Sequence, residues 1–285
     1  MTLHVYDGDD FEELFRQLQR KLISLPPVAT GEWQSQDITG KEAMITRELA
    51  NASIVIGLPQ TSHHLGMKTG ARLPWAEDHF LERVSGEPLN PSPSEAWWPF
   101  AQKVGDDTNK DHKSQGEAFS HTYPERMWPK WAGETYAEMA DSTSVAWDPI
   151  KGIRFYYGDL GDVVDQLDRS PMTRQAYLPI WFPEDTGAVH RERVPCTLGY
   201  HFFIRNDTLQ ITYYMRSCDL IRHFQDDVYM AGRLAQWVRD ELNNRIGKLR
   251  YEVGELIMHI TSLHCFEGDI PMMELRDKEG KAWSA

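Results

Sequence analysis

The sequence predicts a mixed α/β or α+β protein in which helices pack on one large mixed β-sheet. Two observations lead to this class. Apolar stripes with helical spacing occur near the N-terminus and again after residue 216, and several β-rich segments lie elsewhere in the chain. Because the two kinds of segment do not alternate strictly, a regular succession of strand–helix–strand units is not expected.

Few regular elements are expected in the first half of the chain. Residues 8–24 carry apolar side chains at helical spacing, and residues 52–58 form a β-rich run. Residues 59–129 are rich in Pro, Gly, Ser and Asn, with one possible helix over Trp75–Val84. A loop of this length is uncommon in a compact domain, so we expect an insertion or a functional loop region there.

The second half has clearer periodicity. Its expected elements are a helix over 159–167, an extended segment over 176–181, β-rich runs over 197–204 and 208–215, a helix over 228–242 and a strand over 255–264. Arg205-Asn206-Asp207 separates the two β-rich runs and is a favourable turn sequence, so we expect a β-hairpin at this point.

Composition restricts the classes of function. The 285 residues are 41% apolar and 26% charged, as in an ordinary soluble protein, and this length fits one large domain or two small ones, of which we expect one domain over residues 1–285. The sequence has no apolar run of membrane-spanning length and no N-terminal signal pattern. Three oddly spaced cysteines favour a reducing cytoplasm. The net charge of -13 disfavours binding to a nucleic-acid backbone.

Cys196 is the first candidate for chemistry. A lone cysteine is most often a small buried side chain. Here Arg191, Arg193 and Arg216 can supply the positive field that turns a thiol into a thiolate nucleophile. The expected hairpin also returns Arg216 and Ser217 towards the end where Cys196 lies, and those two side chains can hold a phosphate.

The order and spacing of these residues resemble the thymidylate synthase family. The family signature is Pro-Cys, a hairpin, Arg-Ser-x-Asp, a base-reading residue, a long helix and His-x-Tyr. It occurs here as Pro195-Cys196, Arg216-Ser217-Cys218-Asp219, Phe224-Gln225-Asp226-Asp227 and His264-Cys265-Phe266. The resemblance runs from about Tyr157 to Phe266. It implies a thymidylate synthase-like catalytic domain, a homodimer joined through the sheet, a pyrimidine nucleoside monophosphate substrate and 5,10-methylenetetrahydrofolate as the carbon donor.

The resemblance also implies a role for each matching residue. Gln175 stands where the family has the second of two arginines that reach across the dimer, so only Arg174 remains of that pair. The implied roles are nucleophile for Cys196, phosphate ligands for Arg216, Ser217, Arg174 and Arg47, contact near the pyrimidine O2 for Asp219, sugar contact for His264, active-site tyrosine for Tyr123, and catalytic glutamate for Glu77 with Glu82 as the second choice.

Four departures from the family pattern bear on the substrate. Thr197 replaces the histidine of the family's Cys-His, and Met215 replaces the glutamine of its Gln-Arg-Ser. Asp227 replaces the base-reading asparagine, and Phe266 replaces the final tyrosine. The first three also occur in phage-type deoxycytidylate hydroxymethylases. A carboxylate accepts from the cytosine amino group and can share a proton with N3, whereas against uracil O4 two acceptors would face each other. Asp226 lies next to Asp227, so the alignment with the family leaves two neighbouring candidates for the base-reading residue.

We therefore expect a cytidylate or deoxycytidylate 5-hydroxymethylase. In this mechanism Cys196 adds to C6, C5 receives the one-carbon unit, and water adds to the resulting exocyclic methylene. The alternatives are a dCMP or dUMP C5-methyltransferase and a non-catalytic nucleotide- or RNA-binding relative. A zinc deaminase is disfavoured because the sequence has no His-x-Glu with a downstream Pro-Cys-x-x-Cys, and no metal site is expected. Ribose versus deoxyribose stays open. Such relatives are often phage-encoded, in which case the compartment is the host cytoplasm.

Overall fold

A seven-stranded mixed sheet is the centre of the fold in the computed structural model, which describes residues 3–28, 32–33, 36–37, 40–97, 119, 121–129, 158–186 and 194–282. The strand order is β1-β5-β9-β8-β7-β6, and β2 pairs with β5. The β1–β5 and β8–β9 pairs are parallel and the others are antiparallel, which confirms the predicted mixed sheet. The strands are β1 His4–Asp7, β2 Pro27–Val28, β5 Thr46–Gly57, β6 Tyr177–Pro179, β7 Thr197–Arg205, β8 Thr208–Asp219 and β9 Glu252–Phe266, with β3 Glu32–Trp33 and β4 Gln36–Asp37 forming a separate pair.

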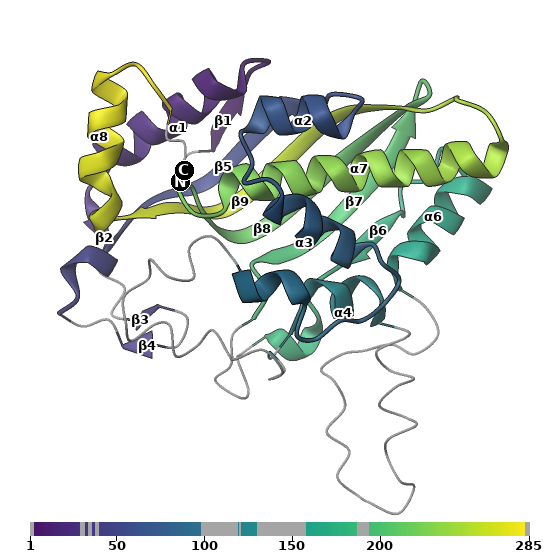
Figure 1. The fold of residues 1–285 in the computed structure, drawn as a ribbon, viewed down its shortest axis with the longest axis horizontal. Coiled ribbons are helices and arrows are strands. Elements are labelled where there is room, and N and C mark those ends of the chain that lie inside the picture. The colour runs from purple at the N-terminus through teal and green to yellow at the C-terminus, as the bar shows by residue number, and fades with distance from the viewer. Residues whose placement is uncertain are drawn as a thin grey trace, which may run out of the picture.

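The described helices include one long helix, α7, that runs across the sheet with α2 and α3 beside it (Figure 1). α7 packs on β8 and β9, while α1 packs on β5 and against α8. The helices are α1 Phe11–Ser24, α2 Ser62–Thr69, α3 Trp75–Arg83, α4 Tyr123–Met127, α6 Leu160–Arg169, α7 Phe224–Ile246 and α8 Ile270–Lys278, with short 3₁₀ turns η1 Glu42–Met44, η2 Pro93–Trp97, η4 Pro183–Asp185 and η5 Glu267–Asp269. None of the helices in the described ranges is long and apolar enough to cross a membrane.

Local sequence explains where several elements begin and end. Asp10 caps α1 by accepting from the backbone N–H groups of Glu12 and Glu13 at 3.0 and 3.1 Å. The α7 helix ends at Gly247, whose φ of 66° is left-handed and therefore favours glycine. In the β7–β8 hairpin, Asn206 and Asp207 both have positive φ, as a two-residue turn between twisted strands requires.

The predicted loop region over residues 59–129 contains more helix than its composition suggested. The helix predicted over Trp75–Val84 is present as α3, but α2 and α4 were not predicted. The α2 sequence has no apolar stripe and includes Gly66, which normally disfavours a helix. A Cβ at Gly66 would lie 2.9 Å from the end of the Leu73 side chain and 3.6 Å from the Tyr229 ring, so α2 packs closely on α7 at this residue.

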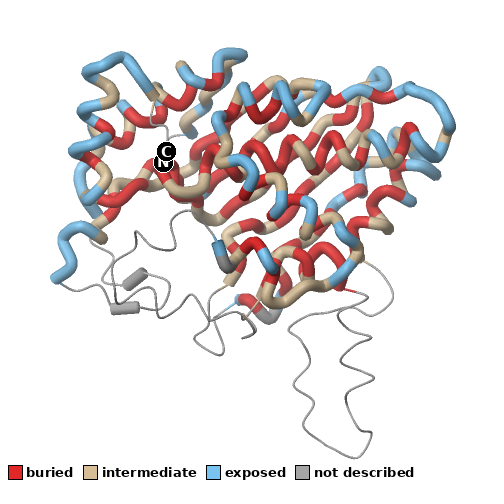
Figure 2. Tube along the Cα trace, viewed as in Figure 1, coloured by how far each residue is buried: buried red, intermediate tan, exposed pale blue. Residues whose placement is uncertain are grey.

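The main apolar core lies between the sheet and its helices, where buried residues concentrate (Figure 2). Phe202, Ile211 and Met258 come from three neighbouring strands, and each is 0% exposed. Tyr177 and Tyr214 are less buried and line, with Arg174 and His201, a shallow concavity on the sheet. The predicted use of the sheet as a dimer interface stays a prediction.

We expect truncation of Leu234 on α7 to destabilise the fold by creating a cavity. Leu234 is 2% exposed, so Leu234→Ala should lower the free energy of unfolding by about 2 to 5 kcal/mol. Leu249→Ala is the matched control, because Leu249 is 94% exposed and its loss should change stability by less than about 0.5 kcal/mol. Urea unfolding at one protein concentration measures both. Equal effects of the two variants would contradict this account of the core.

Candidate active site

The β7–β8 hairpin brings Cys196 and Arg216 together, as predicted. Thr197 pairs with Met215, and the Arg216 backbone N–H donates to the Cys196 carbonyl at 2.9 Å. The Arg216 guanidinium donates to the carbonyls of Pro195 and Val194 and lies 3.7 Å from the Cys196 sulfur. A cation at that distance stabilises a negatively charged sulfur. Arg191 and Arg193, the other two arginines predicted near Cys196, lie outside the described residues.

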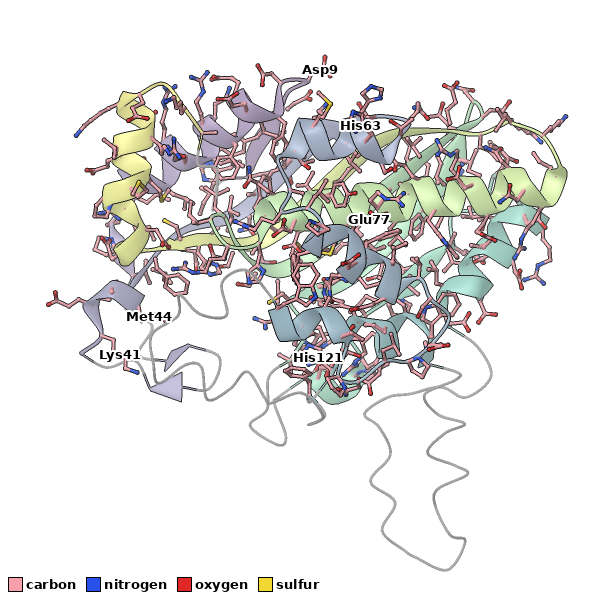
Figure 3. All side chains as sticks on the ribbon, in the orientation of Figure 1. Asp9, Lys41, Met44, His63, Glu77 and His121 are labelled. Atoms are coloured by element: carbon pink, nitrogen blue, oxygen red, sulfur yellow. The ribbon has the colours of Figure 1, made fainter. Side chains whose placement is uncertain are left out.

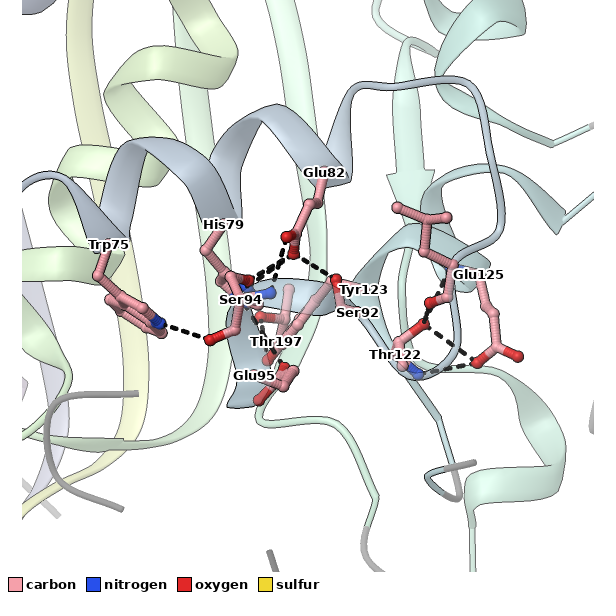
Figure 4. Close-up of polar contacts among 11 residues, drawn as sticks. Trp75, His79, Glu82, Ser92, Ser94, Glu95, Thr122, Tyr123, Glu125 and Thr197 are labelled. Carbon is pink, nitrogen blue, oxygen red and sulfur yellow. Dashed lines mark hydrogen bonds and ion pairs between the residues drawn. The ribbon is translucent and has the colours of Figure 1, made fainter. Parts of the chain in front are cut away.

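Hydroxyl groups cluster directly after Cys196. The Thr197 hydroxyl donates to the Tyr123 hydroxyl at 3.2 Å and hydrogen-bonds the Tyr213 hydroxyl at 2.8 Å. The Tyr200 ring stacks on the Tyr213 ring, with centroids 4.5 Å apart. Figure 4 shows Thr197 and Tyr123 together. Burial raises the pKa of Tyr123 and of Tyr213, so both phenols stay protonated and can donate hydrogen bonds. We define Thr197, Tyr123, Tyr200 and Tyr213 as the hydroxyl cluster.

Asp227 and Asp226 have different environments, although they are adjacent in the first turn of α7. Both Asp226 oxygens are bound to Arg72: its backbone N–H donates at 2.9 Å and its guanidinium at 2.5 Å. Asp227 instead lies 3.6 Å from the sulfur of Cys218. Burial raises the pKa of Asp227 to about 7, although the nearby Arg83 guanidinium opposes this rise. Asp227 is therefore a carboxyl whose proton can be gained or lost near neutral pH.

Ser217, Asp219 and His264 lie together at the ends of the parallel strands β8 and β9. Asp219 pairs in register with His264, and the Ser217 hydroxyl is 3.4 Å from the His264 ring. The Asp219 carboxylate accepts from the backbone N–H groups of Ile221 and Arg222 and from the Arg222 guanidinium. Burial opposes ionisation of Asp219, but Arg222, His264 and His223 together with the backbone N–H of Arg222 outweigh it, and the net effect lowers the pKa of this carboxyl. Asp219 is thus a fixed negative charge.

Glu77 and Glu82 both lie on α3 but have different partners. Glu77 accepts from the Tyr229 hydroxyl at 2.8 Å and from the Arg233 guanidinium at 2.9 and 2.8 Å, where α3 meets α7 (Figure 3). No contact between Glu77 and Cys196 or the hydroxyl cluster is found in the described chain.

Serines hold the carboxylate of Glu82 instead (Figure 4). It accepts from the Ser92 hydroxyl at 2.5 Å and from the Ser94 backbone N–H at 2.7 Å, and also from the Ser94 hydroxyl. The neighbouring residue in sequence, Arg83, stacks on the Tyr123 ring at 4.1 Å. Of the two glutamates, Glu82 is therefore the one adjacent in sequence to a residue that contacts the hydroxyl cluster.

The two predicted phosphate arginines outside the hairpin do not join Cys196 within this chain. Arg47 on β5 donates to Glu267 at 2.7 Å and to the carbonyl of Ile23. Arg174 is exposed and lines the concavity on the sheet with Tyr177 and His201. Neither residue has a described contact with Cys196 or Arg216.

Sequence reasoning missed Arg83 and the two tyrosines of the hairpin. Ala76, Phe80 and Arg83 follow the spacing of one buried helix face, so an arginine in an apolar stripe was a usable signal. Tyr200 and Tyr213 face inward on the paired strands β7 and β8. The sequence pattern shows the inward face of each strand, but only the pairing register of the two strands shows that these tyrosines lie opposite each other. The described residues contain no group of His, Cys, Asp and Glu arranged to hold a metal ion.

The geometry suits covalent addition by a thiolate. Cys196 is partly exposed, whereas Cys218 and Cys265 are 3% and 0% exposed. Burial raises the pKa of Cys218, and it raises the pKa of Cys265 to about 12. Cys196 is therefore the cysteine available to an external electrophile.

We expect iodoacetamide at pH 8 to alkylate Cys196 at least about tenfold faster than Cys218 or Cys265, because the buried thiols remain protonated. Peptide mass spectrometry of timed samples measures the three rates. Cys196→Ala should remove the fast phase and leave the slow one. Fast labelling of Cys218 in the folded protein would contradict the described burial.

The profile of the thymidylate synthase family matches residues 113–278 of this chain. The match spans more than half of the 285 residues and includes Cys196, the hydroxyl cluster, Asp219, Asp227 and His264. Members of this family are folate-dependent transferases that act at C5 of pyrimidine nucleoside monophosphates. The sequence match and the mixed sheet packed by helices agree, and the chain belongs to the thymidylate synthase family.

Proposed function

We propose that this enzyme transfers a hydroxymethyl group to C5 of a cytidine or deoxycytidine monophosphate, with 5,10-methylenetetrahydrofolate and water as co-substrates. The observation that supports this most is the environment of Asp227. Arg72 binds both carboxylate oxygens of Asp226 but not those of Asp227. Asp227 lies beside Cys218, and its negative charge helps to raise the pKa of Tyr213 in the hydroxyl cluster.

Asp227 has the proton affinity that cytosine recognition requires. Neutral cytosine presents an amino donor at N4 and an acceptor at N3. A protonated carboxyl complements both, because its carbonyl oxygen accepts from N4 while its O–H donates to N3. With a pKa of about 7, Asp227 can supply this proton as C6 is attacked and take it back afterwards. Against uracil, an ionised Asp227 accepts from N3–H but faces the O4 acceptor with a second acceptor, which leaves that pair mismatched.

The proposed chemistry uses Cys196 first. Its thiolate adds to C6, and the electron pair that moves to C5 attacks the methylene carbon of the opened folate. A base then removes the C5 proton while tetrahydrofolate leaves, and this elimination gives an exocyclic methylene on the adduct. Water then adds to that carbon, and release of Cys196 gives the 5-hydroxymethyl nucleotide. The hydroxyl cluster supports this step, since Thr197, Tyr123 and Tyr213 can orient a water molecule close to Cys196.

The remaining roles rest on the family resemblance together with the contacts of these residues. We assign Arg216 and Ser217 to the phosphate, Asp219 to the pyrimidine near O2 and His264 to the sugar. Glu82 is the better candidate for the general acid/base, because Glu77 is bound by the Arg233 guanidinium. Arg174 fits the phosphate of a partner subunit, since it lies on the sheet surface that the family uses for dimerisation. Arg47 is engaged by Glu267 and would need to exchange that partner to bind phosphate.

Incubation with methylenetetrahydrofolate and each of CMP, dCMP, UMP and dUMP tests the function directly. We expect a product 30 mass units heavier than CMP or dCMP, the mass of one added CH₂O. Cys196→Ala should reduce the rate below about a thousandth of wild type, because the nucleophile is lost. A product 14 mass units heavier would identify a methyltransferase, and reaction of dUMP alone would identify a uridylate enzyme. Binding without turnover in the wild type would favour a non-catalytic relative.

We expect Asp227→Asn to shift preference from cytosine to uracil nucleotides. The amide donates to O4 and accepts from N3–H, and one hydrogen bond gained with one repulsion removed corresponds to about 2 to 4 kcal/mol, or roughly 30- to 1,000-fold in relative kcat/KM. Asp226→Asn is the matched control. It should lower stability through its contact with Arg72 and leave the base ratio unchanged. Control of the ratio by Asp226 would place the base-reading residue one position earlier.

A further inference from the structure

Arg126 and Asp185 form a buried ion pair between segments that lie 59 residues apart in the sequence. The Arg126 guanidinium donates to both carboxylate oxygens of Asp185, at 2.9 and 3.0 Å, and the two residues are 2% and 3% exposed. The guanidinium also lies over the Phe182 ring, 4.5 Å from its centroid. Two apolar side chains often stabilise a fold as well as such a pair does, because burial of charge is costly. What the pair adds is orientation, since the planar guanidinium fork fits a carboxylate in few arrangements.

The short helix α4 carries Arg126, and Tyr123 lies one turn earlier on it. A helix of five residues has little stability of its own, so tertiary contacts determine where the Tyr123 hydroxyl lies. One contact is with α3, because the Trp128 indole at the end of α4 donates to the Arg83 carbonyl at 2.8 Å. The ion pair adds a contact with η4, which contains Asp185 and lies between β6 and β7.

The chain that leads into η4 is hydrogen-bonded to the beginning of β7. The backbone N–H groups of Ile180 and Trp181 both donate to the Leu198 carbonyl at 3.0 Å. The Phe182 N–H donates to the Asp185 carboxylate at 2.9 Å. These bonds fix the Asp185 carboxylate relative to the beginning of β7.

A ring of contacts thus closes beside the nucleophile. The Thr197 hydroxyl donates to the Tyr123 hydroxyl at 3.2 Å (Figure 4), and Thr197 directly follows Cys196 in the chain. From Thr197 the ring runs along β7 to η4, crosses to α4 through the Arg126–Asp185 ion pair, and returns through Tyr123. The ion pair therefore joins two segments that each contact the residues after Cys196.

We propose that Arg126 and Asp185 are positioning residues, whose ion pair closes this ring and holds the Tyr123 hydroxyl at hydrogen-bond distance from Thr197. The catalytic consequence rests on the proposed function, in which the hydroxyl cluster orients the water that adds to the exocyclic methylene. The position of Tyr123 itself does not rest on it. Because misplacement by about 1 Å can lower a rate about a hundredfold, loss of the ion pair should affect turnover more than folding.

Two variants weaken the ion pair to different degrees. Arg126→Met with Asp185→Asn removes both charges, so neither is left buried without a partner, and Asn keeps an acceptor for the Phe182 N–H. Arg126→Lys keeps a cation opposite Asp185 but replaces the two-point contact by a single ammonium group. Urea unfolding should show that both variants fold. Arg126→Lys decides the test if the double variant does not fold.

Fluorine NMR of the free protein reads the position of Tyr123 without turnover. In protein labelled with 3-fluorotyrosine, the Tyr123 resonance is assigned by its loss in Tyr123→Phe. Thr197→Val should shift this resonance in the wild type, because it removes the hydroxyl that donates to Tyr123. The same substitution should leave the resonance in place when the ion pair is absent, and should shift it less in Arg126→Lys. Equal shifts in all backgrounds would overturn the proposal.

Turnover of CMP or dCMP gives the second readout. Removal of both charges of the ion pair should lower kcat by about 10- to 100-fold and change the nucleotide KM less, because the phosphate ligands are untouched. In the Tyr123→Phe background the same removal should lower kcat by no more than about twofold further, since the hydroxyl that the pair positions is gone. Losses that multiply independently would show that the pair acts through the fold as a whole, and they would contradict the proposal.

Arg245→Gln with Asp165→Asn is the matched control. It removes an ion pair of 2.7 Å between α7 and α6, outside the ring, and should leave kcat and the Tyr123 resonance unchanged. An equal loss of kcat in this control would also count against the proposal. A wild type without turnover of any pyrimidine nucleotide would sink the proposed function, while the fluorine spectra would still decide the role of Arg126 and Asp185.

Discussion

The Arg216 N–H donates to the Cys196 carbonyl across the β7–β8 hairpin, and the other parts of the site depend on this register. It places the Arg216 guanidinium beside the Cys196 sulfur and aligns Thr197 with the inward face that carries Tyr213. A slip of one residue would turn every one of these side chains to the other face of the sheet. The positive-φ turn at Asn206 and Asp207 sets the register from the far end of the hairpin up to Gly199, and a bulge between Thr197 and Gly199 shifts it by one residue next to Cys196.

The parallel pairing of β8 with β9 adds the second half of the site. These strands are joined by α7, which must start immediately after β8 and return to the beginning of β9. This crossover sets Asp219 beside His264 and puts Asp227 in the first helical turn, close to the end of β8. Apart from Arg174 and Arg47, the residues proposed to touch the pyrimidine, the sugar and the phosphate therefore derive from one hairpin–helix–strand unit. The family match covers this unit completely.

Periodicity predicted the regular second half well, because strands and helices there bury one face each. The hairpin, the α7 stripe and the strand ending near His264 are all present, and so is α3 over Trp75–Arg83. The α2 helix was missed, since its sequence has no apolar stripe and it is held by packing against α7. Contacts between distant segments were the harder part: no local pattern indicates that Arg83 reaches Tyr123, or that Arg233 takes Glu77. Contacts between segments that are distant in sequence therefore determine which polar residues lie at the site.

The separate bonding of Asp226 and Asp227 has a consequence for how such an enzyme diversifies. Asp226 links α7 to the backbone and side chain of Arg72, so the fold depends on it. The Asp227 side chain, by contrast, has the Cys218 thiol as its hydrogen-bond partner among the described residues and holds no second helix or loop in place. If Asp227 reads the base as proposed, the structural and the recognition tasks fall to adjacent residues with different neighbours, so a single replacement at residue 227 would change the preferred pyrimidine and leave the Asp226–Arg72 contact in place.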